Sequence, residues 1–295
     1  MGIPKTGVFG LYDLIGIDLM SDVAKSLINI LPEEDVFHEV SDEIPLMKKM
    51  MEKGLMGNKG LKGGFYRFED PDDSSSKQTL DFQDFTYRAF SYERPELSVV
   101  AEQQNDFTLL LEGDSKYSKY AWDILSNTFC YAASLVPDVN TSLVAIDDAM
   151  KLGYNWAKGP FEMIDEVGVD NFISRLKKEG REIPWIIQEA AGKSFYRVNE
   201  GHLEYFTAEG AFKRVQRDQG LRRFTEERKT HQPILTNKAA SYYEINNAIG
   251  MVEFHSKANA LDTNSMELLG QAVAHAEKNF TGLIIHNDAS HFSCD

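Results

Sequence analysis

The sequence predicts a mainly α-helical chain with two copies of one helical module, followed by the opening of an α/β domain. One observation is an internal repeat: Gly7–Asp18 returns as Gly159–Asp170, 152 residues later at every position. Both copies read Gly-x-Phe-x-apolar-x-Asp-x-apolar-Gly-apolar-Asp, and each later closes on Phe-Tyr, at residues 65–66 and 195–196. The other observation is a change from helical to strand periodicity after Ser241.

The first copy starts at its own motif, so we expect a truncated module over residues 1–70. Helices are predicted for residues 11–15 and 18–31, with Gly16 as the breaker and Asp18 as the N-cap of the second helix. Apolar residues recur at helical spacing on that second helix, at Leu19, Val23, Leu27 and Ile28.

A further helix over residues 44–53 ends at Gly54, which suits a helix C-terminus. The glycine-rich run 57–64 then leads into Phe65-Tyr66. Such a run can cradle phosphate, but no strand precedes it and no helix follows it. We therefore favour a structural turn, in which glycine permits positive φ.

Residues 71–116 are expected to be a linker and irregular segment, richest in Asp and Ser near its start. The second module is assigned to residues 117–204. Its predicted helices cover residues 117–135 and 144–152, and a third opens at Gly159-Pro160, where Asp170 repeats the capping role of Asp18. On the first of these helices one apolar face is predicted to be core, at Trp122, Leu125, Phe129 and Ala133.

The connector, residues 205–235, breaks the acidic trend of the chain with seven Lys and Arg between 213 and 229. It could contact an anion, but we favour a solvated connecting helix. Residues 236–295 read as paired strands at 242–246 and 250–255, a helix at 264–278 and a strand at 283–286. This order indicates the opening of an α/β domain.

Composition limits the classes of function. The net charge of −15 argues against a general nucleic-acid or anionic-membrane surface. No segment is apolar enough to span a membrane, and the N-terminus lacks a signal-peptide pattern. The two cysteines, Cys130 and Cys294, show neither disulfide nor zinc-ligand spacing, so we expect a reducing cytoplasmic location.

Residues 146–153, Ile-Asp-Asp-Ala-Met-Lys-Leu-Gly, together with 159–170, closely resemble the C-terminal helical domain of 3-hydroxyacyl-CoA dehydrogenases. Residues 57–66 are similar to the closing loop of that domain. Two such modules in tandem resemble the multifunctional fatty-acid β-oxidation enzymes. The resemblance implies an acyl-CoA substrate and association into homo-oligomers through the helical modules.

The last segment resembles the start of an enoyl-CoA hydratase (crotonase) domain, through Lys257–Asp262 and Phe292–Asp295. This resemblance implies that the CoA side of a substrate contacts Ala258, Asn259, Ala260 and Leu261. It also implies an oxyanion-hole N–H near Cys294, while a second donor and the proton-shuttling glutamates would lie beyond Asp295.

The nicotinamide-binding domain of the dehydrogenase family is not found, because no strand is followed by Gly-x-Gly-x-x-Gly. NAD is therefore expected only in a parent protein. The family's substrate-side Asn aligns with Trp122, and Asn127 is about five positions away, more than one helical turn. We predict that the chain alone is inactive, with no catalytic, cofactor or metal residue.

Two hypotheses remain. The chain is either part of a dehydrogenase fused to a hydratase, or a stand-alone, non-catalytic helical dimerisation or scaffold module. The repeated Asp13 and Asp165 are interpreted as helix-end hydrogen-bonding groups rather than catalysts. Cys130 is interpreted as a buried small hydrophobe. The seven histidines show no metal or dyad spacing.

Overall fold

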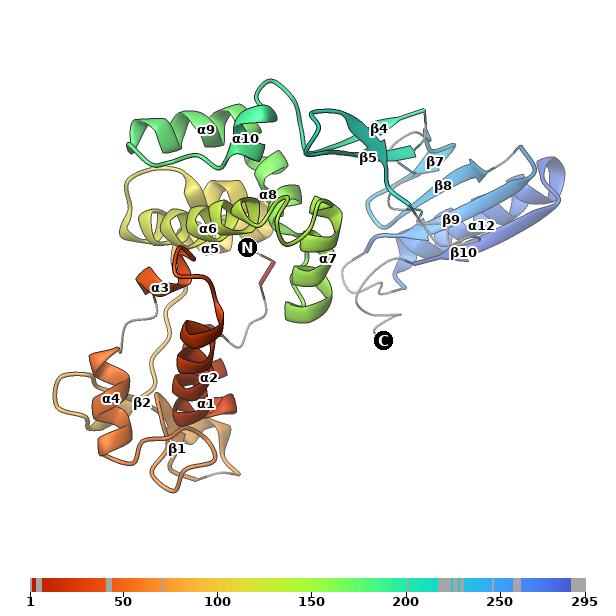
Figure 1. Cartoon of the computed structure of the whole chain (residues 1–295). Coiled ribbons are helices and arrows are strands. Elements are labelled where there is room, and N and C mark those ends of the chain that lie inside the picture. The colour runs from red at the N-terminus through yellow and green to blue at the C-terminus, as the bar shows by residue number, and fades with distance from the viewer. Residues whose placement is uncertain are drawn as a thin grey trace. The chain divides into compact units, whose positions relative to one another are not determined.

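Helices hold more of the described residues than strands do, and the described strands form three small sheets (Figure 1). The chain divides into two compact units, residues 1–140 with 145–188 and residues 141–144 with 189–295. The computed structural model describes residues 2–3, 7–40, 44–70, 72–200, 202–216, 224, 228, 231–245, 247–256 and 261–287.

The first unit begins with a short helical group. Gly16, with a φ of 112°, separates its first two helices and is the N-cap of the second. The expectation that Asp18 caps this helix is wrong: Asp18 lies in the first turn, where its charge suits the helix dipole. Gly54, with a φ of 75°, follows the last helix as expected. The helices are α1 (Gly7–Ile15), α2 (Ile17–Ile30), α3 (Phe37–Val40) and α4 (Pro45–Glu52).

A three-stranded antiparallel sheet follows, in the order β1-β2-β3. The Phe65 carbonyl accepts a hydrogen bond from the Leu80 N–H at 2.9 Å, which extends the pairing by one residue. Residues 71–116, expected as a linker and irregular segment, carry ordered elements of their own. From β1 onward, the elements are β1 (Tyr66–Phe68), η1 (Ser74–Ser76), β2 (Lys77–Leu80), β3 (Tyr87–Ala89), α5 (Glu96–Gln104) and η2 (Phe107–Leu111).

The core of this group joins its helices to its sheet. Phe65 is 2% exposed, and its ring centroid lies 4.6 Å from that of Phe9. The side chains buried together here are Ile17, Met50, Leu55, Phe65 and Leu80.

The rest of the first unit is helical and packs around α6. The predicted apolar face is confirmed: Trp122, Leu125, Phe129 and Ala133 are all buried. The Phe172 ring packs against Trp122 and Phe129, with centroid distances of 5.4 and 5.9 Å. The helices are α6 (Lys116–Ser134), α7 (Leu143–Tyr154), α8 (Pro160–Val167), α9 (Val169–Lys178) and α10 (Trp185–Glu189).

The repeated motif opens α8 with Pro160 in its first turn, as expected. Gly168, with a φ of 85°, separates α8 from α9 and is the N-cap of α9. Asp170 therefore does not cap this helix, which corrects the sequence expectation. It lies in the first turn of α9.

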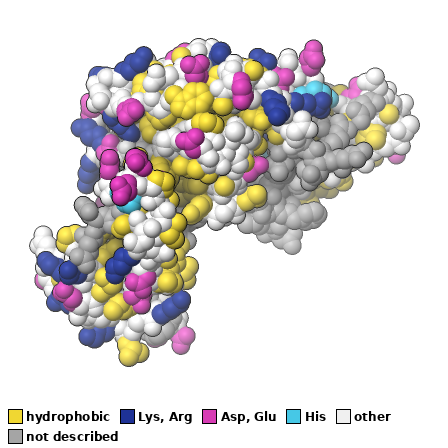
Figure 2. Space-filling model, viewed as in Figure 1, with side chains coloured by type: hydrophobic (Ala, Val, Ile, Leu, Met, Phe, Trp, Pro, Cys, Tyr) yellow, Lys and Arg dark blue, Asp and Glu magenta, His cyan; other side chains and the backbone are white. Residues whose placement is uncertain are grey.

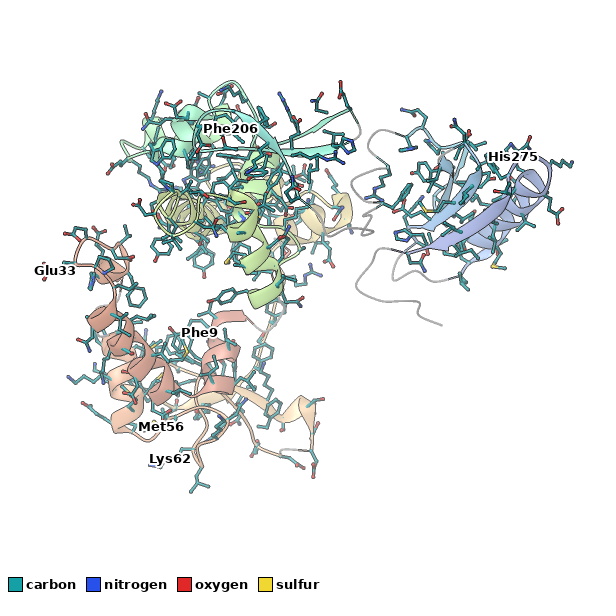
Figure 3. The ribbon with its side chains drawn as sticks, turned by 45° about the vertical axis from the view of Figure 1, so that its right-hand side comes forward. Phe9, Glu33, Met56, Lys62, Phe206 and His275 are labelled. Carbon is teal, nitrogen blue, oxygen red and sulfur yellow. The ribbon has the colours of Figure 1, made fainter. Side chains whose placement is uncertain are left out.

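The second unit contains an antiparallel sheet of order β4-β5-β6. Phe206 is fully buried at the end of β5, and its N–H donates to the Phe195 carbonyl at 2.7 Å (Figure 3). Lys213 and Arg214 of the basic connector lie on β6, so this part is a strand rather than the expected helix. The strands are β4 (Tyr196–Asn199), β5 (His202–Phe206) and β6 (Phe212–Arg214).

The same unit ends in a four-stranded sheet of order β10-β9-β8-β7, with α12 along one face (Figure 1). The expected strand pair and helix are confirmed, and β10 pairs parallel with β9. Ala240, Tyr242, Val252, Leu268 and Ala272 form the core between sheet and helix. The elements are β7 (Leu235–Thr236), β8 (Ala240–Ile245), β9 (Ile249–Phe254), α12 (Thr263–Asn279) and β10 (Gly282–His286).

Candidate functional site

Asp13 is a buried acid that ties α1 to the start of β1. It is 1% exposed, and its Oδ1 and Oδ2 accept hydrogen bonds from the backbone N–H groups of Phe65 and Tyr66, at 2.8 and 2.7 Å. Burial raises the pKa of the Asp13 carboxyl, while the two N–H groups and the charge of Lys77 act to lower it. Asp13 therefore has a structural role, although its partners lie at a strand and not at a helix end as expected.

The glycine-rich loop packs directly on Asp13. A Cβ on Gly64 would lie 2.0 Å from Asp13 Oδ1, and one on Gly57 would lie 2.6 Å from the Asp13 carbonyl oxygen. Figure 3 places Met56 and Lys62 around this loop at one end of the group. The structural-turn interpretation is confirmed, because these glycines allow close approach to α1.

This loop is also the part of the chain whose composition most suits a dinucleotide phosphate. It follows α4 and precedes β1, so it does not join a strand to a helix N-terminus as a nicotinamide cradle does. Two of its glycines, Gly57 and Gly64, pack against Asp13. This loop therefore does not have the form of the family's nicotinamide cradle.

A second buried acid, Asp147, organises the start of α8. It is fully buried on α7, and its oxygens accept from the backbone N–H groups of Phe161 and Glu162 at 2.9 and 3.2 Å. A Cβ on Gly159 would lie 2.2 Å from the Asp147 Cγ. The Gly-Pro pair of the motif thus lets a helix N-terminus meet a carboxylate from another helix.

Charged side chains next to Asp147 pair with one another. Lys151 Nζ lies 2.9 Å from Glu162 Oε1 and 3.1 Å from Asp148 Oδ1. Burial lowers the pKa of Lys151, but these carboxylates outweigh it and the pKa is raised. The other oxygen of Glu162 accepts from the Gly159 N–H at 2.8 Å. These groups hold α7 and α8 together.

The position that aligns with the family's substrate-side Asn carries an indole in the core. Trp122 is 3% exposed, and its Nε1 donates to Glu179 at 2.9 Å. The Arg175 guanidinium lies 3.8 Å from the Trp122 ring centroid. Asn127 accepts from Arg181 at 2.6 Å. Both residues therefore contact other side chains of the same helical group.

The expected crotonase-like positions fall mostly where the structure gives no description. Ala258, Asn259, Ala260 and Cys294 lie outside the described residues. Leu261 is 57% exposed and directly precedes Asp262, the N-cap of α12. The Asp262 carboxylate accepts from the Ser265 N–H at 2.8 Å, which fixes the start of that helix.

Cys130 is half-buried rather than buried as expected; burial raises the pKa of its thiol, while the charge of Arg181 acts to lower it. Among the described side chains, no group of three His, Cys, Asp or Glu could hold a metal ion. A membrane-crossing helix is likewise not found in the part of the chain that the structure describes.

Sequence reasoning missed the role of Asp147. An acid inside an apolar helix, followed twelve residues later by Gly-Pro, was the available signal. A contact between two helices cannot be read from the spacing of residues within one helix, so the motif alone does not reveal this role. The partner of Asp13 was missed for the same reason.

The family model of the 3-hydroxyacyl-CoA dehydrogenase, C-terminal domain matches residues 1–67 and 123–214, more than half of the chain. The chain belongs to this family. The matched residues include Asp13, Asp147 and Phe65. No solved structure matches the chain.

Three relatives align with nearly the whole chain. A Rickettsia felis protein, provisionally named a fatty acid oxidation complex trifunctional enzyme, is 32% identical over 294 residues, which cover 99% of this chain. Its Rickettsia prowazekii counterpart is 31% identical over 296 residues. A Bacillus subtilis protein, provisionally named a 3-hydroxyacyl-CoA dehydrogenase, is 28% identical over 300 residues. The chain spans 37% of the length of each relative.

Proposed function

We propose that this chain is part of an NAD-dependent 3-hydroxyacyl-CoA dehydrogenase, fused to an enoyl-CoA hydratase, that works in fatty-acid β-oxidation. The chain supplies acyl-CoA-side packing and association, while NAD binding and both catalytic centres belong to residues outside it. The family match over residues 1–67 and 123–214 carries this proposal. The relatives' names support the pathway.

Two helical modules in tandem form part of the proposal. Its support is that the same order of elements occurs twice: α1, Gly16 and α2 in one stretch, and α8, Gly168 and α9 in the other. Each stretch is followed by an antiparallel three-stranded sheet. The proposed division is residues 1–70, 71–116, 117–204, 205–235 and 236–295.

The crotonase assignment of residues 236–295 is the second part. Its support is the β8-β9-α12-β10 order, in which β10 returns parallel to β9. Under this proposal Ala258, Asn259, Ala260 and Leu261 line the CoA side of the hydratase site, and Cys294 lies at its first oxyanion donor. The cytoplasm is the proposed location, because two widely spaced cysteines suit a reducing compartment.

Association into a homo-oligomer is proposed through α1 and α2. Figure 2 shows hydrophobic atoms over this part of the surface. The apolar residues recur with helical spacing and face outward, which favours coverage by another protein surface. The exposed apolar residues of the two helices include Val8, Leu11, Leu14, Leu19, Val23, Leu27 and Ile30.

Size-exclusion chromatography with light scattering tests this surface. We expect a dimer or larger species for the unaltered chain and a monomer for Leu19→Glu with Val23→Glu. The matched control is Met266→Glu, at an exposed position on α12. A monomer over an approximately hundredfold concentration range would contradict self-association.

The alternative is a stand-alone, non-catalytic helical scaffold, which the exposed apolar face favours. The coding sequence on both sides of this chain separates the two functions. An adjoining Gly-x-Gly-x-x-Gly after a strand, with hydratase glutamates downstream, supports the fused enzyme. Intact flanks with start and stop codons support the scaffold.

A further inference from the structure

The first unit contains a cavity of about 880 Å³ that none of the functions above uses. Its volume is in the range of small-molecule sites in proteins. Its lining includes the aromatic rings of Tyr66, Phe90 and Tyr92, the cations Lys77, Arg94 and Lys158, and the acids Glu102 and Asp106.

Lys77, at the start of β2, is held in this cavity by two aromatic rings. Its Nζ lies 4.1 Å from the Tyr66 ring centroid and 4.3 Å from that of Phe90. The Lys77 carbonyl also accepts from the Phe90 N–H at 3.0 Å, which fixes the two residues relative to each other. The ammonium is therefore positioned before any ligand arrives.

Lys77 makes no ion pair in the described part of the chain, and its charge acts on the Asp13 carboxyl only at longer range. The two other cations of the cavity differ, because Arg94 pairs with Glu102 and Lys158 pairs with Glu166. An ammonium has three N–H donors, and contacts with ring faces leave these without oxygen acceptors. An anionic oxygen is the group that would accept hydrogen bonds from the Lys77 ammonium and balance its charge.

A flat apolar surface lies beside this cation. The Phe90 and Tyr92 rings are nearly parallel, with an interplanar angle of 8° and centroids 6.4 Å apart. Lys77 already lies over the Phe90 ring, whereas Tyr92 is 67% exposed and keeps surface that a ligand can reach. Flat rings stack on such surfaces in an offset arrangement.

We propose that this cavity binds a planar-ring organic anion. Its carboxylate or phosphate accepts from Lys77, and its ring stacks on the exposed ring of Tyr92. A nucleotide and an aromatic carboxylate share this chemistry. The proposal does not depend on dehydrogenase or hydratase activity, so failure of one does not decide the other.

Isothermal titration calorimetry of the full chain tests this with AMP and benzoate as the two anions. The comparison compounds are ribose 5-phosphate, which lacks the planar aromatic ring, and adenosine and benzyl alcohol, which lack the negative charge. We expect AMP or benzoate to bind at least about tenfold more tightly than its own comparison compounds. Binding of AMP alone identifies a nucleotide site, and binding of benzoate alone identifies an aromatic-acid site.

The variants assign the binding to this cavity. Lys77→Gln and Tyr92→Ala are each expected to weaken it about tenfold, whereas Lys77→Arg retains it. Lys59→Gln, at an exposed lysine outside the cavity, is the matched control and leaves it unchanged. Circular dichroism confirms folding, and Tyr92→Ala decides the test if Lys77→Gln fails to fold. No heat with either anion, equal binding of the comparison compounds, or equal loss in Lys59→Gln would overturn the proposal.

Discussion

Asp13 and Gly64 lie so close together that a Cβ on Gly64 would be 2.0 Å from Asp13 Oδ1. This proximity lets the carboxylate reach the N–H groups of Phe65 and Tyr66, the next two residues of the chain. One glycine and one buried acid therefore connect the glycine-rich loop, the helix α1 and the sheet that begins at β1.

Replacing Gly64 with alanine should destabilise this group strongly. The added methyl cannot be accommodated without moving the Asp13 carboxylate off its two N–H donors, and we expect a cost of about 2 kcal/mol or more. Urea unfolding of the full chain, followed by hydrogen exchange at Phe65 and Tyr66, measures the loss. Gly153→Ala is the matched control, because nothing lies within 4 Å of its added Cβ. A loss in Gly64→Ala no larger than in Gly153→Ala would contradict the packing argument.

The stability of this group should fall as pH rises through the titration of Asp13. Burial raises the pKa of Asp13 above its ordinary value of 3.8. The folded state therefore binds the proton more readily than the unfolded state. This contribution is complete below pH 3.8 and is lost as pH rises through the folded pKa. The free energies of unfolding of the unaltered chain and of Asp13→Asn, compared up to about pH 7, measure the contribution of Asp13. An increase in the stability difference in favour of the unaltered chain would contradict it.

The contribution of Asp262 to stability should depend on pH in the opposite direction. The hydrogen bond from the Ser265 N–H lowers the pKa of this N-cap below 3.8. Its stabilising contribution is present above pH 3.8 and is lost as pH falls through the folded pKa. Hydrogen exchange in α12 of Asp262→Ala should therefore differ from that of the unaltered chain at neutral pH and approach it in acid. A difference that persists in strong acid would exclude this role for the carboxylate.

Phe129→Ala should destabilise the helices around α6 by about 3–5 kcal/mol, because Phe129 is fully buried against Phe172. Ile124→Ala, on the same helix but 45% exposed, should change the free energy of unfolding by less than about 0.5 kcal/mol. Thermal unfolding of both variants measures the difference. Equal losses would mean that the apolar face of α6 is assigned incorrectly.

Residues 236–295 should be the least stable part of the chain. The outer edge of β10 has no neighbouring strand among the described residues, and Ile284 and Ile285 are 45% and 56% exposed. Unpaired strand edges and exposed apolar residues favour opening and aggregation. Hydrogen exchange should show amides of residues 241–287 opening well before those of α7, and removal of the segment should leave the melting of α6–α9 nearly unchanged. Equal protection in β10 and α7 would refute this order.

Local patterns were enough to predict most helices and the final strand pair. The spacing of Trp122, Leu125 and Phe129 identified a buried face because a helix places such residues on one side. Glycine and proline marked where helices begin and end, as at Gly54 and Pro160.

Features that depend on distant segments could not be predicted in this way. The Asp13 carboxylate finds its partners 52 and 53 residues away, and the cavity around Lys77 combines strands with helices that follow later. Asp18 was expected to cap α2 because Asp is a common N-cap, yet Gly16 already provides the required backbone turn. The short strands β2 and β3 have too few residues to show a clear alternation.

Under the proposed function, this chain supplies the helical, acyl-CoA-side part of a dehydrogenase and no cradle for the nicotinamide cofactor. Titration of the full chain with NADH, followed by its fluorescence, tests this most directly. We expect no saturable change, because the glycine-rich loop is packed on Asp13 and does not connect a strand to a helix. A saturable enhancement with micromolar affinity would contradict the account.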